Sequence, residues 1–165
     1  MFDAIHHNKK IYKAVLEDLS AIRLFLLENS LRPSVSISQR SIYLYIKENA
    51  TIIATIGAEI NHPCALIRAA GVREDYRNAG LGKHLFESLE RELALLEIRE
   101  LYLFSRQAPD FWSKMGFSRC EVQEIMQHLS DTEQVKEFLL DNSIWTDVAW
   151  KKSRKFTPKL SNSLR

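Results

Sequence analysis

A glycine-bearing stretch at residues 72–83 holds residue types and spacings that suit the binding of a diphosphate. Its sequence is Val-Arg-Glu-Asp-Tyr-Arg-Asn-Ala-Gly-Leu-Gly-Lys. Gly80 and Gly82 lack a Cβ atom, so the backbone there can approach an anion closely and can adopt a positive φ. Arg77 and Lys83 add positive charge on either side. Together these residues predict a cradle for a diphosphate.

The elements on either side of this stretch should expose backbone N–H groups to an anion. Residues 65–71 form a short apolar run after the turn pair His62-Pro63, which predicts a strand. On the other side, leucines recur at intervals of three and four, which predicts a helix with one buried stripe. These leucines are Leu81, Leu85, Leu89, Leu93 and Leu96. The first N–H groups of such a helix have no partner within the helix and lie at its positive end, which favours a bound pyrophosphate.

The pattern Arg77-x-x-Gly80-x-Gly82 resembles the coenzyme A signature of the GNAT superfamily of N-acetyltransferases, Gln/Arg-x-x-Gly-x-Gly/Ala. The alternative is an ordinary glycine-containing turn between a strand and a helix. A Rossmann nucleotide site is less favoured, because the glycine spacing is not G-x-G-x-x-G. The resemblance implies an enzyme that uses acetyl-CoA as its co-substrate. The coenzyme-binding residues that it implies are Ala70, Gly71, Val72, Arg77, Asn78, Ala79, Gly80, Leu81, Gly82 and Lys83.

A second motif at residues 101–117 reads Leu-Tyr-Leu-Phe-Ser-Arg-Gln-Ala-Pro-Asp-Phe-Trp-Ser-Lys-Met-Gly-Phe. It resembles the GNAT signature in which a strand ends in a small polar residue, an alanine follows, and a helix carries Phe-Tyr/Phe-x-x-x-Gly-Phe. Its compact spacing is similar to the branch that includes N-acetylglutamate synthase domains and the acetyltransferases of arsenic-resistance operons. Members of that branch act on the α-amino group of amino acids or similar compounds. The resemblance spans roughly residues 10–152 and is most specific over residues 64–117.

Acetyl transfer from a thioester to an amine needs a neutral amine, a hydrogen-bond donor for the oxyanion and a proton for the departing thiolate. The resemblance implies an oxyanion donor among the backbone N–H groups around residues 69–71. The sequence departs from the family at two other positions. Trp112 stands where many members have a tyrosine that protonates the thiolate, and an indole N–H is not a usable acid. Arg68 stands where many members have an acidic base.

Ser105 follows the predicted strand 101–104 and is the candidate catalytic residue, because its hydroxyl can relay a proton through water. Capping of the next helix explains a serine at this position equally well. Arg68 and Arg106 can each pair with the carboxylate of an acidic or amino-acid acceptor. For Arg68 we favour an ion pair with Glu59 on the neighbouring predicted strand.

The second and third predicted strands, and the loop before them, hold residues that concern the acceptor. The serine-rich loop at residues 34–40 corresponds to a region that often borders the acceptor site in the resembled family. Tyr43, Tyr45 and Glu59 can face the same pocket. Ordinary positions in the sheet are nevertheless the favoured interpretation for these three side chains.

Hydrophobic periodicity predicts the remaining elements. Strands are expected at residues 9–14, 41–47, 51–60, 64–72, 101–104 and 144–150, and helices at residues 17–29, 79–97 and 131–140, with another in the second motif. Short turns predict an antiparallel meander, while the order strand, helix, strand favours one parallel pair. The fold class is therefore α/β (α+β). The resemblance implies the GNAT fold, a mostly antiparallel sheet of six to seven strands with a splayed parallel pair and about four flanking helices.

The chain of 165 residues has the length of one domain, which we assign to residues 1–153. The net charge of +2 is unevenly distributed, because residues 151–165 carry +6 and the preceding residues carry −4. Pro158, two serines and a lack of apolar periodicity predict a disordered basic tail at residues 154–165. A solubilising tail is favoured over contact with nucleic acid or an anionic surface, so no nucleic-acid partner is expected.

The sequence has no apolar run of membrane-spanning length and no signal-peptide core, which predicts a cytoplasmic protein without a membrane partner. Cys64 and Cys120 have no metal-ligand spacing, so we expect reduced cysteines and no metal site.

Three functions remain open. The leading one is an acetyl-CoA-dependent N-acyltransferase that acetylates the primary amine of a small molecule, an amino acid or similar compound, by direct attack in a ternary complex. The alternatives are a protein or peptide N-acetyltransferase and a non-catalytic acyl-CoA binding module. The resemblance also implies a homodimer as one assembly, because family members often dimerise.

Overall fold

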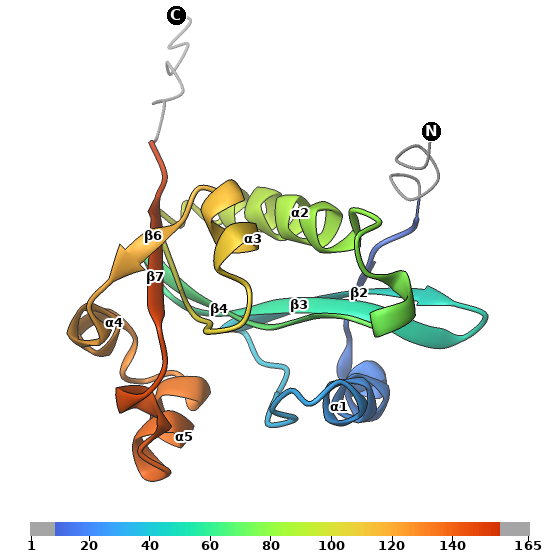
Figure 1. Ribbon diagram of the computed structural model, residues 1–165, viewed down its shortest axis with the longest axis horizontal. Coiled ribbons are helices and arrows are strands. Elements are labelled where there is room, and N and C mark those ends of the chain that lie inside the picture. The colour runs from blue at the N-terminus through green and yellow to red at the C-terminus, as the bar shows by residue number, and fades with distance from the viewer. Residues whose placement is uncertain (1–8, 156–165) are drawn as a thin grey trace, which may run out of the picture.

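The structure of the protein, a computed structural model, describes residues 9–155 as one mixed sheet with helices on both faces (Figure 1). Its strands are β1 (Tyr12–Lys13), β2 (Ser41–Glu48), β3 (Thr51–Asn61), β4 (Cys64–Val72), β5 (Glu100–Phe104), β6 (Ser118–Cys120) and β7 (Ala149–Ser153). Its α-helices are α1 (Leu19–Glu28), α2 (Leu81–Leu95), α3 (Pro109–Lys114), α4 (Val122–Leu129) and α5 (Glu133–Leu140). Three 3₁₀ turns, η1 (Leu16–Asp18), η2 (Glu74–Tyr76) and η3 (Ser143–Trp145), join them. The strand order is β1-β2-β3-β4-β5-β7-β6, and the predicted fold class is confirmed.

The parallel pair in this sheet is short. Strands β4 and β5 pair from Cys64 opposite Glu100 to Ile67 opposite Leu103, and the ladder ends there although β4 continues to Val72. All other neighbouring strands are antiparallel. The predicted parallel pairing is therefore confirmed, and it covers only the first part of β4.

Strand β4 is bulged immediately beyond the parallel ladder. Gly57 of β3 lies opposite Arg68, and Thr55 lies opposite Gly71, so two residues of β4 face a single residue of β3. One of the two is Ala69, which has a φ of 53°. A bulge bends its strand and increases the local twist. The bend coincides with the point where β4 and β5 stop pairing.

The helices divide between the two faces of the sheet. Helices α2 and α3 cover one face, and α1, α4 and α5 cover the other (Figure 1). On the first face, the buried side of α2 packs against Ile67 and Leu103. On the second face, Leu66 and Tyr102 pack against α4 and α5. Alternate residues of β4 and β5 therefore belong to separate cores, one on each face.

A buried ion pair joins the second face to α5. The Arg68 guanidinium donates to a Glu59 carboxylate oxygen at 3.0 Å and to the Ser34 backbone carbonyl at 2.7 Å. The Glu59 carboxylate also accepts the backbone N–H groups of Glu133 at 2.6 Å and Gln134 at 3.1 Å, at the beginning of α5. The favoured pairing of these two side chains is confirmed, and it fixes two strands, a loop and a helix relative to one another.

Two predicted strands differ from those observed. The last strand, predicted at residues 144–150, begins only at Ala149, because Ile144 is buried in η3 against the core beneath α4 and α5. One apolar run thus serves two elements. The first strand, predicted at residues 9–14, is reduced to Tyr12–Lys13.

Other differences concern short elements and helix ends. Strand β6 and helix α4 were not predicted, because β6 has only three residues and α4 only eight. Leu96 lies past the end of α2 and is 47% exposed, so the buried stripe ends at Leu93. An isolated sequence shows such short elements poorly because their pairing partners lie far away along the chain.

Strand β7 ends at Ser153, the end of the domain that we assigned from the sequence. The tail predicted at residues 154–165 lies outside the described residues from residue 156 onward. Within residues 9–155, every helix falls short of the combination of length and apolar character that a membrane span requires.

Replacing Glu59 by glutamine should destabilise the fold, because it leaves the buried Arg68 charge without its partner. We expect the free energy of unfolding to fall by about 3 kcal/mol, measured by urea denaturation. The matched control is Glu87→Gln, which removes an exposed pair with Lys83 and should cost less than about 0.5 kcal/mol. Equal losses in the two variants would contradict the stabilising role of the buried pair.

Candidate functional site

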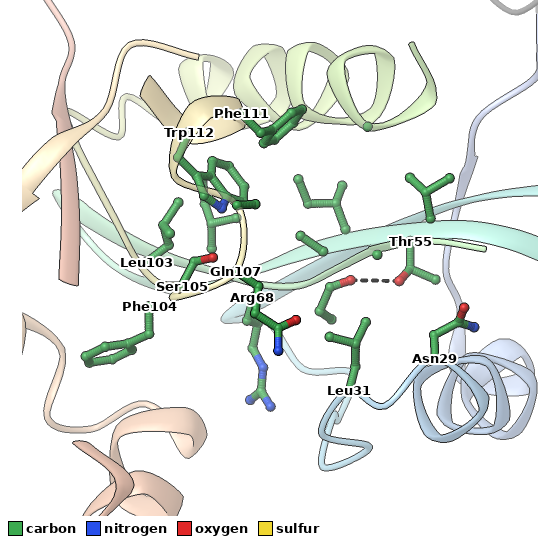
Figure 2. A pocket seen from close by; sticks show the side chains of 18 of the residues that line it. Asn29, Leu31, Thr55, Arg68, Leu103, Phe104, Ser105, Gln107, Phe111 and Trp112 are labelled. Carbon is green, nitrogen blue, oxygen red and sulfur yellow. Dashed lines mark hydrogen bonds between the residues drawn. The ribbon is translucent and has the colours of Figure 1, made fainter. Parts of the chain in front are cut away.

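A cleft of about 860 Å³ lies where β4 and β5 separate. Its wall includes residues from both faces of the sheet. Figure 2 shows Phe111 and Trp112 of α3 on one side, with Phe104, Arg68 and Leu31 on the other. The end of the parallel ladder therefore opens a passage that joins the α2 face to the α5 face.

The N-terminus of α2 forms one end of this cleft. Gly80 is its N-cap residue and has a φ of 81°, a conformation that glycine adopts without strain. The first helical bond runs from His84 N–H to the Gly80 carbonyl at 3.0 Å, which leaves the N–H groups of residues 81–83 without partners inside the helix. No side chain caps this helix and no acidic residue occupies its first turn. The positive end of a helix in this state attracts an anion.

Gly82 has a different role from Gly80. It lies in the first turn of α2, where a Cβ atom would meet the Phe111 ring at 3.4 Å and a Val72 methyl group at 3.8 Å. These are ordinary van der Waals distances, so the packing of α3 on α2 does not itself require a glycine here. The missing side chain leaves the backbone open toward the cleft, whose wall includes Gly82.

Nine of the ten predicted coenzyme-binding residues line the cleft, and Ala79 does not. The nine are Ala70, Gly71, Val72, Arg77, Asn78, Gly80, Leu81, Gly82 and Lys83. The Arg77 Nε–H donates to the Val72 carbonyl at 3.0 Å, which holds the guanidinium beside the turn. Lys83 is exposed and lies 3.8 Å from a Glu87 carboxylate oxygen. The turn thus gathers positive charge and unpaired N–H groups at one end of the cleft.

The bulge in β4 is held in place by one hydrogen bond from β3. The Thr55 hydroxyl donates to the Ala69 carbonyl at 2.7 Å, drawn as a dashed line in Figure 2. A bulge leaves one residue of the longer strand outside the ladder. The backbone around residues 69–71 therefore lines the cleft at the point where an oxyanion donor was predicted.

Trp112 belongs both to the core and to the cleft wall. Its side chain is 4% exposed and packs edge-on against the rings of Phe86, Phe111 and Phe117. Figure 2 shows its ring nitrogen turned toward the cleft. The indole is thus a fixed hydrogen-bond donor in the wall where many family members place a tyrosine.

Ser105 lines the cleft, and its backbone is fixed on both sides. Its N–H donates to the Val148 carbonyl at 2.9 Å, and its carbonyl accepts the Trp150 indole N–H at 2.8 Å. The N-cap residue of α3 is Ala108, with no side-chain hydrogen bond. The capping role considered for Ser105 is therefore wrong. The residue lines the cleft, and its hydroxyl does not cap α3.

The loop between α1 and β2 is tied to α5 and η3. Arg32 donates to carboxylate oxygens of Glu137 at 3.2 Å and Asp141 at 2.7 Å, and to the Ser143 hydroxyl at 3.0 Å. The Ser34 hydroxyl donates to the other oxygen of Glu137. These bonds join the loop to α5 and η3 at the edge of the cleft, whose wall includes Arg32, Gln134 and Phe138.

The acceptor-side predictions are only partly met. Residues 29–32 line the cleft, whereas the serine-rich residues 34–40 do not. Tyr43 and Tyr45 pack against α1 in a separate core cluster, as expected for ordinary sheet residues. Burial raises the pKa of Tyr43 far above that of an exposed tyrosine, so this phenol stays neutral.

Sequence reasoning missed the acidic residue of the wall. Asp147 lines the cleft just before β7, and among the described residues of the wall it alone carries a carboxylate. Arg106, which was singled out from the sequence, lines the same cleft from the end of β5.

Comparison with known families identifies the family of the chain. Residues 8–117 match the model of the Acetyltransferase (GNAT) family. The chain belongs to this family. It is therefore an acyl-CoA-dependent N-acetyltransferase with acetyl-CoA as co-substrate, and the resemblance seen in the two motifs is confirmed.

Solved GNAT structures share the fold at low sequence identity. An acetyltransferase of the GNAT family from Staphylococcus aureus is 15% identical, with a TM-score of 0.69 over 88% of this chain and 99% of that chain. N-acetylglutamate synthase from Neisseria gonorrhoeae, crystallised with coenzyme A and L-arginine, is 12% identical, with a TM-score of 0.67 over 89% of this chain and 33% of that one. An Escherichia coli N-acetyltransferase for an alanine of a ribosomal protein is 16% identical, with a TM-score of 0.67 over 92% of this chain and 97% of that one. No curated protein matches the chain by sequence.

Replacing Arg77 by glutamine should weaken acetyl-CoA binding, because a charged donor is lost beside the unpaired N–H groups of α2. We expect the Kd from calorimetry to rise by about 10-fold to 100-fold. Arg73→Gln is the matched control, since Arg73 is already paired with Asp75 at 2.6 Å and does not line the cleft. The assignment of Arg77 fails if both variants bind acetyl-CoA equally well.

Proposed function

We propose that this GNAT enzyme transfers the acetyl group of acetyl-CoA to the primary amine of a small molecule, an amino acid or a similar compound, by direct attack in a ternary complex. The observation that carries the proposal is the tie between the α1–β2 loop and α5. Arg32 and Ser34 hold this loop to Glu137 and Asp141 across the α5 side of the cleft. A groove for an extended peptide would need this side to be open.

Acetyl-CoA would approach from the α2 face. Its diphosphate fits the N–H groups of residues 81–83 and the Arg77 guanidinium, where both helix end and side chain are positive. The pantetheine arm would follow residues 70–72 of β4, which lie beyond the end of the pairing with β5. Ala70 and Gly71 have small side chains, which leaves room for the arm in the cleft.

Catalysis by this site would rest first on holding the amine and the thioester in line, which by itself supplies much of the acceleration. A backbone N–H around residues 69–71 would stabilise the oxyanion. The fixed Trp112 indole N–H would donate a hydrogen bond near the departing sulfur, and Ser105 would pass a proton to it through water. Both side chains already line the cleft.

A protein or peptide acceptor is the alternative. The Escherichia coli relative that acetylates a ribosomal protein has the same fold, so the fold does not separate the two classes. The bonds between the α1–β2 loop and α5 favour the small acceptor, because a chain entering on that side would have to displace them.

The direct test measures thiol release from acetyl-CoA across free amino acids, polyamines and peptides with free N-termini. We expect turnover with at least one free amino acid, and kcat/KM at least about 10-fold lower with the peptide that begins with the same residue. Higher kcat/KM with the peptide would overturn the proposal in favour of a peptide acetyltransferase. Tight acetyl-CoA binding without turnover of any amine would contradict the proposed transfer.

Replacing Ser105 by alanine should reduce kcat by at least about 10-fold, because the proton relay to the sulfur is lost. The Kd for acetyl-CoA should stay unchanged, since the serine backbone is held by bonds that alanine keeps. Ser113→Ala on the exposed side of α3 is the matched control. Full turnover in the Ser105 variant would show that the relay assignment is wrong.

A further inference from the structure

Two residues of opposite charge, Arg106 and Asp147, lie just past the end of β5 and just before the beginning of β7. The register of these strands places Leu103 opposite Trp150 and Phe104 opposite Ala149, and the Ser105 N–H donates to the Val148 carbonyl. Arg106 and Asp147 follow in bends, one residue beyond this last hydrogen bond on each side. Both line the cleft, and neither forms an ion pair with another described residue.

The segments that carry these two residues lie beside the α5 face of the sheet. Phe104 and Ala149 belong to the core beneath α4 and α5, and Phe104 stacks obliquely on Phe138 of α5. Arg106 follows Phe104 by two residues, and Asp147 precedes Ala149 by two and is bonded to Ser143 of η3. Both residues line the cleft together with Gln134 and Phe138 of α5.

The Asp147 carboxylate is oriented by its own backbone. One oxygen accepts the Val148 N–H at 2.8 Å, and the Asp147 N–H donates to the Ser143 carbonyl at 3.1 Å. The second carboxylate oxygen has no hydrogen bond among the described residues, and the side chain is half-buried. Asp147 thus presents a fixed acceptor of hydrogen bonds to the cleft.

The other nearby carboxylate is fully committed. One Glu59 oxygen accepts the Glu133 N–H, and the other accepts both Arg68 and the Gln134 N–H. Its charge is balanced by Arg68, which occupies the place of the acidic base in many family members. An incoming ammonium group therefore finds its partner at Asp147.

We propose that Asp147 receives the ammonium group of the acceptor and takes its proton, while Arg106 binds a carboxylate on the same molecule, so that the acceptor is an α-amino acid zwitterion. This inference rests on the proposed function. It gives the missing base and the substrate class to two residues of the cleft wall. An ammonium and a carboxylate on one carbon match an acidic and a basic residue that line the same cleft.

The transfer step conserves atoms and charge. One ammonium proton passes to the Asp147 carboxylate and from there to water, which leaves a neutral amine. The nitrogen forms a bond to the thioester carbonyl carbon, and the bond from that carbon to sulfur breaks. The second nitrogen proton passes through water to the coenzyme thiolate. The products are the N-acetyl amino acid, free coenzyme A and one proton in solution.

The other charged residues that line the cleft with Asp147 are all basic. Arg77, Lys83 and Lys114 belong to the α2 turn and to α3. Arg106 is exposed after the end of β5, and Arg68 on β4 is neutralised by Glu59. Arg32 in the loop after α1 is paired with Glu137 and Asp141. Helix α5 contributes an uncharged side chain, Gln134, to the wall.

The first test compares Asp147→Asn with the exposed control Asp131→Asn in the full chain. We expect Asp147→Asn to lower kcat/KM for the amino acid by about 100-fold, with an unchanged Kd for acetyl-CoA. Its kcat/KM should also need a higher pH to reach half of its plateau, because only amine already neutral in solution can react. A kcat/KM and pH profile equal to those of the control would overturn the assignment. Wild-type enzyme that acetylates no amine would instead sink the proposed function itself.

The second test asks which group Arg106 binds. Wild type and Arg106→Gln are compared on leucine and isoamylamine, phenylalanine and phenethylamine, and glutamate and γ-aminobutyrate, pairs that differ by the α-carboxylate. We expect wild type to prefer the amino acid by at least 10-fold in kcat/KM, and the variant to lose about that preference while retaining its activity on the amine. An equal loss on both members of each pair would show that Arg106 does not bind the carboxylate.

Discussion

The end of hydrogen bonding between β4 and β5 is the constraint on which the rest of this structure depends. A continuous sheet would separate the α2 face from the α5 face. Here the ladder stops at Ile67, and the bulge at Ala69, held by the Thr55 hydroxyl, begins at once. The cleft opens where this pairing ends. Its wall includes both the first residues of α2 and residues from the opposite face of the sheet.

The Glu59–Arg68 pair gives a structural role to a position that is catalytic in many relatives. In many GNAT enzymes this place on β4 holds an acid, and here it holds an arginine whose charge is neutralised by a buried glutamate. The Glu59 carboxylate also accepts the first N–H groups of α5, so the pair positions the helix to which the α1–β2 loop is bonded. A base, if the site uses one, has to come from another element.

The sequence predicted what depends on neighbouring residues and missed what depends on distant pairing. Gly80 and the leucines of α2 lie within one short segment, so turn and helix were recognisable together. Asp147 enters the cleft only because β7 pairs with β5, about a quarter of the chain away. The bonds of Arg32 join residues more than one hundred positions apart, and no local pattern announces them. The coenzyme contacts of the turn stay predictions until binding is measured.

The two-sided cleft has a kinetic consequence. If the coenzyme binds along the α2 face and the amine on the α5 face, as proposed, their routes into the cleft would not cross. Neither substrate would then have to bind before the other, and neither product would block the exit of the other. Steady-state inhibition by each product should then be competitive only with the substrate that uses the same side, the signature of a random sequential order.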